Sequence, residues 1–255
     1  MQRTKTGIQG LDKALMGGFP EGNLVLLSGG AGTGKSTMGM QFLVNGATLF
    51  GEKGLYISTE QTEEELQKAA SQFGWNLVDL ENKNLLKVIY FKVLEQDHFI
   101  QKVEEFVETF KPKRIVVDSL TTLTDSMMMS ELQKDVGVSL IKIADTVSPV
   151  QRTEQIMTKI ILYNLINKLK EFGATVIMTS ELPEGMQRLS ADGVTEFVTD
   201  GVVTLENLVV GQSAFRTLRI RKMRYTDHGK TSLNYQLTSK GVAFEESKPS
   251  DGLSL

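Results

Sequence analysis

Short apolar runs alternate with amphipathic segments along most of the chain. The apolar, β-favouring runs predict buried strands over residues 23–27, 54–58, 86–91, 114–118 and 174–178. Between them, apolar residues at helical spacing predict helices over 35–48, from Thr62 to Gly74, from Asp97 to Phe110 and over 153–172. Strands and helices that alternate with short connections favour an α/β fold: a mostly parallel, twisted sheet with helices on both faces. Ligands then bind at the carboxyl ends of the strands.

Toward the C-terminus the pattern changes, because predicted strands follow one another without helices. Residues 201–206, 215–223, 233–237 and 242–244 predict antiparallel strands added at one end of the sheet. The segment 126–152 lacks a simple pattern and contains a run of three methionines. Excursions of this length are usually functional, and we interpret this one as an element that faces a partner or a pore.

Residues 29–36 read GGAGTGKS and lie between the first predicted strand and the first predicted helix. This spacing and context predict a phosphate-binding loop. We expect positive φ at glycines 29, 30, 32 and 34, so that backbone N–H groups and the positive end of the helix face a nucleoside triphosphate. Lys35 would reach the β- and γ-phosphates, and the Ser36 hydroxyl would bind Mg²⁺. The full predicted nucleotide-binding segment is Gly30, Ala31, Gly32, Thr33, Gly34, Lys35, Ser36 and Thr37.

Two acidic residues follow predicted strands and therefore belong at the same edge of the sheet. Asp118 is the expected partner of Ser36 in holding Mg²⁺, directly or through water. Glu60 follows the strand that we expect beside the phosphate loop, where its carboxylate would orient and deprotonate an attacking water. Structural alternatives remain open: Asp118 as a solvated turn residue, and Glu60 as an acid that caps the next helix.

Composition narrows the range of functions without adding a new one. The 255 residues suit one large domain over 1–246, followed by a polar, loosely ordered tail over 247–255. The net charge of −3 gives no general attraction to nucleic acid. Cysteine is absent, which excludes thiolate catalysis, and two histidines argue against a zinc site. Without a long apolar run, we expect a cytoplasmic protein that does not bind membranes.

Seven segments, in order, resemble the KaiC-like ATPases of the RecA superfamily, in particular the single-domain archaeal group related to RadA. They are TGIQGLD with GGFPEG, GGAGTGKS, QFGW, RIVVDSLTTL, VIMTSE, GVTEFVTDGVV and RKMRYTDH. The resemblance covers residues 6–244. It implies a RecA-like core that assembles as a homo-oligomer, a hexameric ring or a filament, with ATP between neighbouring copies.

The resemblance also implies roles for the acidic and polar residues. Glu60 would be the catalytic glutamate and Asp118 the magnesium aspartate, while residues 179–181, with Ser180 at their centre, would form a polar sensor behind the γ-phosphate. Gln61 stands where the family often has a second glutamate, which implies slow hydrolysis.

Basic residues near the end of the chain match a pair that KaiC-like subunits project into the neighbour's site. This pair is Lys222 and Arg224, with Thr226 and His228 facing the nucleotide. Tyr225 replaces a usual glycine there, and Ser239 replaces a common aspartate, which affects the contact with the neighbour and with the nucleobase. The alternative is that Arg219, Arg221, Lys222 and Arg224 are only the solvated side of an edge strand.

Three functions are compatible with these features. The first is an ATP hydrolase or ATP-dependent switch that works as an oligomer. The second is a recombination accessory protein that binds single-stranded DNA, which Lys134, Lys142, Arg152, Lys159 and Arg188 support only weakly among many acids. The third is a non-hydrolysing, nucleotide-dependent scaffold with a protein partner, because Gln61 departs from the family pattern.

Overall fold

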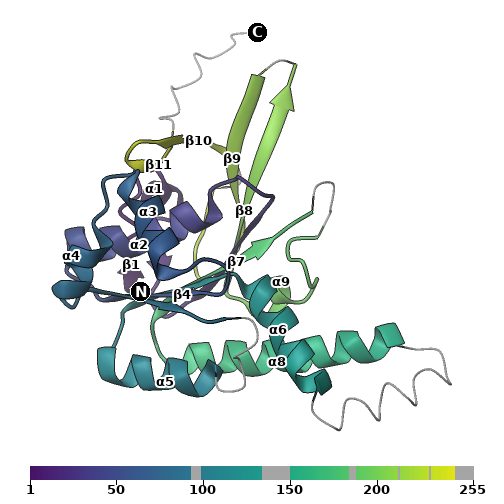
Figure 1. Ribbon diagram of the computed structural model, residues 1–255. Coiled ribbons are helices and arrows are strands. Elements are labelled where there is room, and N and C mark those ends of the chain that lie inside the picture. The colour runs from purple at the N-terminus through teal and green to yellow at the C-terminus, as the bar shows by residue number, and fades with distance from the viewer. Residues whose placement is uncertain (93–98, 134–149, 184–187, 212, 230, 245–255) are drawn as a thin grey trace.

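The structure is a computed structural model that describes residues 1–92, 99–133, 150–183, 188–211, 213–229 and 231–244. Its main strands are β3 (Leu24–Gly29), β4 (Gly54–Ser58), β5 (Leu86–Tyr90), β6 (Arg114–Asp118), β7 (Thr175–Glu181), β8 (Gly201–Val210), β9 (Ser213–Met223), β10 (Leu233–Thr238) and β11 (Gly241–Phe244). They form one sheet in the order β11-β10-β9-β8-β3-β7-β6-β4-β5 (Figure 1). The strands from β8 to β5 in this order are parallel, and β9, β10 and β11 extend the sheet antiparallel. The predicted sheet is therefore confirmed.

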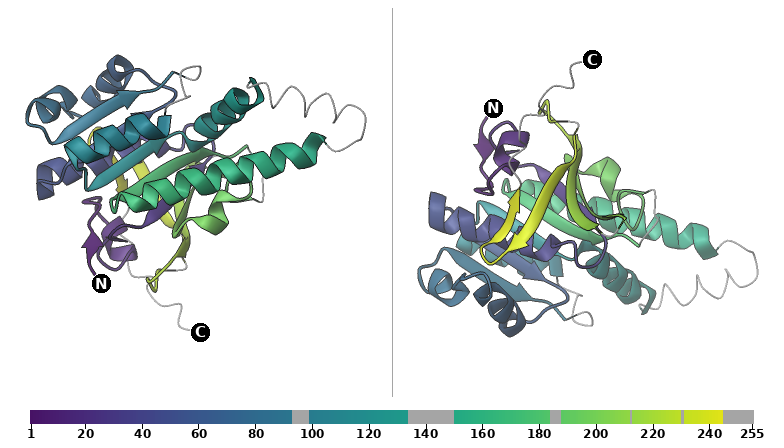
Figure 2. Two further views of the ribbon diagram at one scale, coloured as in Figure 1. Left: turned by 90° about the horizontal axis from the view of Figure 1, so that it is seen from below. Right: turned by 90° about the horizontal axis from the view of Figure 1, so that it is seen from above.

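Helices cover both faces of this sheet, as predicted (Figure 2). They are α1 (Leu11–Ala14), α2 (Lys35–Phe50), α3 (Glu63–Ser71), α4 (Leu77–Asn82), α5 (Phe99–Phe110), α6 (Leu120–Gln133), α8 (Val150–Glu171) and α9 (Thr195–Val198). Along β3, Val25 and Leu27 join the core under α1 to α4, whereas Leu24 and Leu26 join the core under α5, α6 and α8. Within the described residues, no helix is long and apolar enough to cross a membrane.

The position of β4 differs from the prediction. β4 pairs with β6 and β5, while the neighbours of β3 are β7 and β8. Glu60 therefore does not follow a strand beside the phosphate loop. β3, β4, β6 and β7 are buried along nearly their whole length, so their apolar runs carry no information about which strand lies next to which.

The segment 126–152 is also more helical than expected. α6 continues to Gln133 and α8 begins at Val150, so only 134–149 lie outside the described residues. The apolar residues of α6 do not recur on one face of the helix, so the sequence pattern did not predict it. On α8, Ile160 is exposed although its spacing placed it on the apolar face. The expected helix cap at Asp97 and the expected tail also lie outside the described residues.

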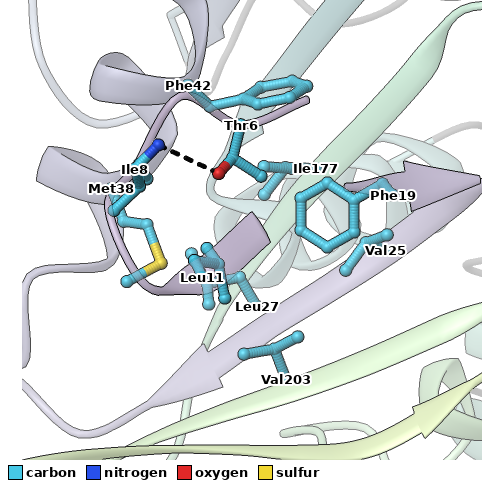
Figure 3. A pocket seen from close by; sticks show the side chains of 10 residues that line it. All are labelled: Thr6, Ile8, Leu11, Phe19, Val25, Leu27, Met38, Phe42, Ile177 and Val203. Carbon is cyan, nitrogen blue, oxygen red and sulfur yellow. Dashed lines mark hydrogen bonds between the residues drawn. The ribbon is translucent and has the colours of Figure 1, made fainter. Parts of the chain in front are cut away.

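Residues 1–23, which precede β3, pack over β3 and α2. Its short strands β1 (Arg3–Thr4) and β2 (Phe19–Pro20) pair with each other, and the Asp12 carboxylate accepts hydrogen bonds from the Thr6 N–H (2.7 Å), the Thr6 hydroxyl (2.8 Å) and the Gly7 N–H (3.0 Å). Ile8 and apolar neighbours surround a cavity of about 10 Å³ (Figure 3). A cavity of this size holds one water at most, so it is a packing void and not a ligand site.

The helix α2, which follows the phosphate loop, is attached at two places. On the β6 side, the fully buried Arg114 donates from Nε to Glu52, just beyond the end of the helix (2.7 Å), and from one amino group to the Phe42 carbonyl in its middle (2.9 Å). On the β11 side, the Gln41 amide bonds both backbone groups of Val242 (2.7 and 3.1 Å). The antiparallel extension therefore supports the same helix as the parallel sheet.

Candidate nucleotide-binding site

The phosphate loop joins β3 directly to α2. Only Gly32 (φ 70°) and Gly34 (φ 91°) have positive φ, so the expectation for glycines 29 and 30 was wrong. Gly29 is needed for a different reason, because a Cβ there would lie 2.4 Å from the Leu205 carbonyl oxygen of β8. Gly34 is the N-cap residue of α2 and has no side chain. The first N–H groups of a 16-residue helix thus remain available to an anion.

Lys35 lies folded against this loop and is buried. Its Nζ donates to the carbonyl oxygens of Gly29 and Gly30, both at 3.0 Å. The Glu181 carboxylate at the end of β7 lies 3.7 Å from the same nitrogen. The ammonium group is therefore held beside the backbone that would receive phosphates, and Glu181 is the nearby acid.

Tyr235 of β10 supports the loop from the antiparallel extension. Its hydroxyl donates to the Thr33 carbonyl at 2.5 Å, and the Thr33 hydroxyl donates to the Gly30 carbonyl at 2.9 Å. Burial raises the pKa of Tyr235 above its ordinary value, which keeps the phenol protonated and able to donate. Sequence reasoning missed this residue. The available signal was that this tyrosine lies inside a predicted strand, residues 233–237.

Asp118 is buried at the end of β6 and bonded through both carboxylate oxygens. The Tyr56 hydroxyl donates to Oδ2 at 2.5 Å, and the Thr179 hydroxyl donates to Oδ1. Burial, and next the Asp118 carboxylate, raise the pKa of Tyr56 well above its ordinary value, whereas the Ser36 side chain lowers it. Asp118 is 4% exposed, so the alternative of a solvated turn residue is wrong.

These groups fit a magnesium ion. Mg²⁺ prefers hard oxygen ligands and is usually held by one or two protein groups together with phosphates and water. The Ser36 hydroxyl and the Asp118 carboxylate are ligands of this kind. Over the described residues there is no group of three or more His, Cys, Asp or Glu side chains suited to a metal. With these two protein ligands, the remaining ligands of such an ion would be phosphates and water.

Glu60 lies beyond the end of β4 and is held by residues that follow β6. Its Oε1 accepts hydrogen bonds from the Ser119 hydroxyl at 2.5 Å and the Thr122 hydroxyl at 2.7 Å. The next helix, α3, is capped by Thr62 with Glu65. Glu60 is therefore not the helix cap that was its alternative role, and its carboxylate is instead fixed beside the start of α6.

The predicted sensor segment connects β7 to the same region. Ser180 is buried, its hydroxyl lies 3.2 Å from the Thr121 hydroxyl, and it accepts from the Ala191 N–H at 3.3 Å. The Thr121 hydroxyl also accepts from the Glu181 N–H at 3.2 Å. Hydroxyl groups thus tie together the carboxyl ends of β6 and β7, and Thr121 is a further residue that the motifs did not reveal.

The basic residues near the end of β9 lie at the opposite edge of the sheet. Met223 pairs with Gly201, which pairs with Val25, so the end of β9 is level with the beginning of β3. The Arg224 N–H donates to the Asp200 carbonyl, and the Asp200 N–H donates to the Leu24 carbonyl. The structure therefore does not bring Lys222, Arg224 or His228 together with the phosphate loop of the same chain.

At this opposite edge the basic side chains are bonded within the chain. Lys222 Nζ donates to three carbonyls around α9, of which Thr199 is nearest at 2.6 Å. Arg224 donates to Asp200 Oδ1 at 2.8 Å. Burial lowers the pKa of Lys222, as does the neighbouring Arg224. β9 lies between β8 and β10 in the sheet, but β10 pairs only with residues 216–218, so the end of β9 that carries Lys222 pairs with β8 alone. His228 lies on the following turn, with Nδ1 at 3.2 Å from the Gly229 carbonyl oxygen.

A larger hollow of about 670 Å³ lies between α6, α8 and the segment before α9. The charged side chains that line it are of both signs: Lys159, Arg188, Asp125, Asp192 and Glu196. Burial raises the pKa of Asp125, and Asp192 raises it further. This mixture does not form the continuous basic surface that a nucleic-acid backbone requires. Of the other cations considered for DNA, Lys134 and Lys142 lie outside the described residues.

The chain is similar to known proteins in sequence and in structure. A sequence model of the KaiC ATPase family matches residues 4–136 and 126–249. The circadian clock oscillator protein KaiC of Synechococcus elongatus is 30% identical over 250 residues, which are 94% of this chain and 43% of that protein. KaiC of Thermosynechococcus vestitus is 30% identical over 240 residues, 90% and 42% of the two chains. The chain thus spans less than half the length of these curated relatives.

A solved structure is similar over nearly the whole chain. It is the crystal structure of a KaiC-like protein from the hyperthermophilic archaeon Pyrococcus horikoshii, with a TM-score of 0.78 and 30% identity. The match covers 96% of this chain and 99% of that chain. The residues matched by the family model include the phosphate loop, Glu60, Asp118 and the basic end of β9.

Proposed function

Because the chain belongs to the KaiC-like ATPases of the RecA superfamily, we propose that it binds ATP with Mg²⁺ at the phosphate loop and hydrolyses it. The observation that carries this proposal is the position of the loop, Asp118 and Glu60 at one edge of the sheet. In parallel α/β sheets this edge is where ligands bind. The membership itself supports a nucleotide-binding ATPase, and the geometry supports the division of roles given below.

Each group at this edge has a distinct role in the proposal. Lys35 and the first N–H groups of α2 hold the phosphates, and Ser36 with Asp118 holds Mg²⁺, which neutralises phosphate charge when bound. Glu60 accepts a proton from the water that attacks the γ-phosphorus, while the bond to the β,γ-bridging oxygen breaks and ADP leaves. The two hydroxyls on Oε1 would orient this carboxylate toward its water.

A neighbouring copy would supply Lys222 and Arg224. The five residue steps from Leu24 to Gly29 correspond to about 16 Å along the strand, too far for Arg224 to span while it is bonded to Asp200. For this basic pair to act on phosphate, it would have to enter the site of another chain through a head-to-tail, heterologous contact such as that of a ring or filament. Activity would then depend on assembly.

One experiment tests the whole proposal. ATP hydrolysis and molecular mass are measured together over a dilution series, with and without single-stranded DNA, for the native chain and for Lys35→Ala. We expect hydrolysis only in the assembled fraction and none in Lys35→Ala. Phosphate release by Lys35→Ala at the native rate would reject the site, and full activity in a monomer would reject the role of a neighbour.

The same experiment separates the two other functions. Stimulation of hydrolysis by DNA would favour the recombination function, although the mixed charges of the hollow beside α8 give it little support. ATP-dependent assembly without phosphate release would favour a scaffold. The hydrogen bonds from Ser119 and Thr122 would favour that outcome, because they already occupy Oε1 of Glu60, the proposed base.

A further inference from the structure

A buried tyrosine holds one of the two groups that would bind Mg²⁺. Tyr56 lies in the middle of β4, is fully buried, and donates its hydroxyl to Asp118 Oδ2 at 2.5 Å. Ser36, at the start of α2, is among the neighbours that affect the same hydroxyl. We propose that Tyr56 is a positioning residue that holds the Asp118 carboxylate in place and sets the affinity of this site for a divalent cation. This inference rests on the proposed ATP site.

The strand order explains why Asp118 needs a residue that holds it in place. Asp118 ends β6, and β7 separates β6 from β3, which leads into the phosphate loop. Asp118 and Ser36 therefore belong to elements that are not hydrogen-bonded to each other through the sheet. β4 lies on the other side of β6, and Tyr56 pairs with Val116 in the register. From that position its long side chain reaches the carboxylate two residues farther along the neighbouring strand.

The hydrogen bonds fix how the carboxylate presents its lone pairs. Each oxygen of an ionised carboxylate has about two acceptor sites. Tyr56 occupies one on Oδ2 and Thr179 occupies one on Oδ1, so one site on each oxygen remains for a cation or its water. Partners of this kind orient metal ligands, and their removal typically weakens metal affinity about 10- to 100-fold.

The test is Tyr56→Phe, which removes the hydroxyl and keeps the ring in the core. Binding of a fluorescent ATP analogue to the full chain is measured first in EDTA and then during a MgCl₂ titration. We expect nucleotide affinity in EDTA to change less than twofold, and the Mg²⁺ concentration at half-saturation to rise about 10-fold or more. A merely structural role would lower both affinities together.

Two control variants make the result specific. Tyr163→Phe on the exposed side of α8 also removes a phenol hydroxyl and should leave the Mg²⁺ titration unchanged. Asp118→Asn should weaken Mg²⁺ binding by itself, and adding Tyr56→Phe to it should have almost no further effect. Additive effects of the two substitutions would show that Tyr56 does not act through Asp118 and would overturn the inference.

The outcomes separate this inference from the proposed function. If the native chain binds no nucleotide, both fail. If it binds nucleotide with Mg²⁺ but Tyr56→Phe leaves the half-saturation unchanged, only the positioning role fails. Should Tyr56→Phe not fold, 3-fluorotyrosine placed at position 56 keeps the hydroxyl. Its fluorine resonance should shift when Mg²⁺ is added to the nucleotide complex, and an unchanged resonance would overturn the inference.

Discussion

The two edges of one sheet differ in what they could do with ATP. At the carboxyl edge, hydroxyl groups hold each part in place: those of Tyr56 and Thr179 hold Asp118, that of Ser119 holds Glu60, and that of Tyr235 supports the phosphate loop. At the amino edge, Lys222 and Arg224 are bonded to backbone carbonyls and to Asp200. The first edge could hold a nucleotide by itself, whereas the second carries charge without a place for phosphate. In the proposed site, the two parts would therefore meet between copies.

Removal of Arg224 is the substitution from which we expect the largest effect. Arg224→Ala should lower turnover about 10³- to 10⁵-fold, because a trans-acting arginine neutralises charge that develops in the transition state. That range corresponds to about 4–7 kcal/mol. Binding of ATP should persist, since Lys35 and the α2 N–H groups are unchanged. The measurement is phosphate release at saturating ATP, together with nucleotide binding.

Mixing two inactive variants provides the matched control for this prediction. Lys35→Ala retains its arginine, and Arg224→Ala retains its phosphate loop. In a randomly mixed head-to-tail assembly, roughly a quarter of the interfaces would combine the two intact parts and recover activity. If the mixture stays inactive while it co-assembles, the two edges do not complete one site.

Glu60 tests the carboxyl edge alone. Glu60→Gln should lower turnover about 10²- to 10⁴-fold, which is the usual contribution of a general base. ATP affinity should be unchanged, because Glu60 does not contact the phosphate loop in the proposed site. Glu63→Gln, in the first turn of α3, removes the same charge nearby and should retain activity. Equal rates in Glu60→Gln and the native chain would remove Glu60 from the mechanism.

The two edges also differ in how far the sequence reveals them. GGAGTGKS has a spacing that chemistry dictates, so the loop and its position between strand and helix were predictable. Asp118 was predictable from the apolar strand before it. The strand order was not, because buried parallel strands look alike, and so Glu60 was assigned to the wrong neighbour. Tyr56 and Tyr235 were missed because a buried tyrosine resembles any other core aromatic until its hydroxyl partner is known.

Substitution of Tyr235 tests whether the antiparallel extension stabilises the carboxyl edge. Tyr235→Phe leaves the buried Thr33 carbonyl without its donor, which should lower the free energy of unfolding by about 1–3 kcal/mol. ATP affinity should fall as well, both with and without Mg²⁺. Urea unfolding and nucleotide binding check the two effects, with Tyr163→Phe as control. Unchanged affinity would mean that the loop holds its shape without β10.

The smallest expected effect concerns the helix that follows Glu60. Thr62 caps the start of α3, and its hydroxyl accepts a hydrogen bond from the Glu65 N–H. Thr62→Ala should lower the free energy of unfolding by about 0.5–1 kcal/mol, measured by urea unfolding at pH 7. Turnover should change little if Ser119 and Thr122 hold Glu60, as their hydrogen bonds indicate. A large loss of turnover would instead show that the start of α3 positions the base.

The pH dependence of this cap has a definite sign. The Thr62 N–H, and then the Thr62 hydroxyl, lower the pKa of Glu65 below its ordinary value. A carboxylate whose pKa is lower in the folded state stabilises the fold above its unfolded pKa and loses that contribution as the pH falls through the folded pKa. The difference in stability between the native chain and Glu65→Gln should therefore shrink on acidification below about pH 4. Glu64→Gln, an exposed acid of the same turn, should show no such convergence, and a difference that grew at low pH would contradict the hydrogen-bonded cap.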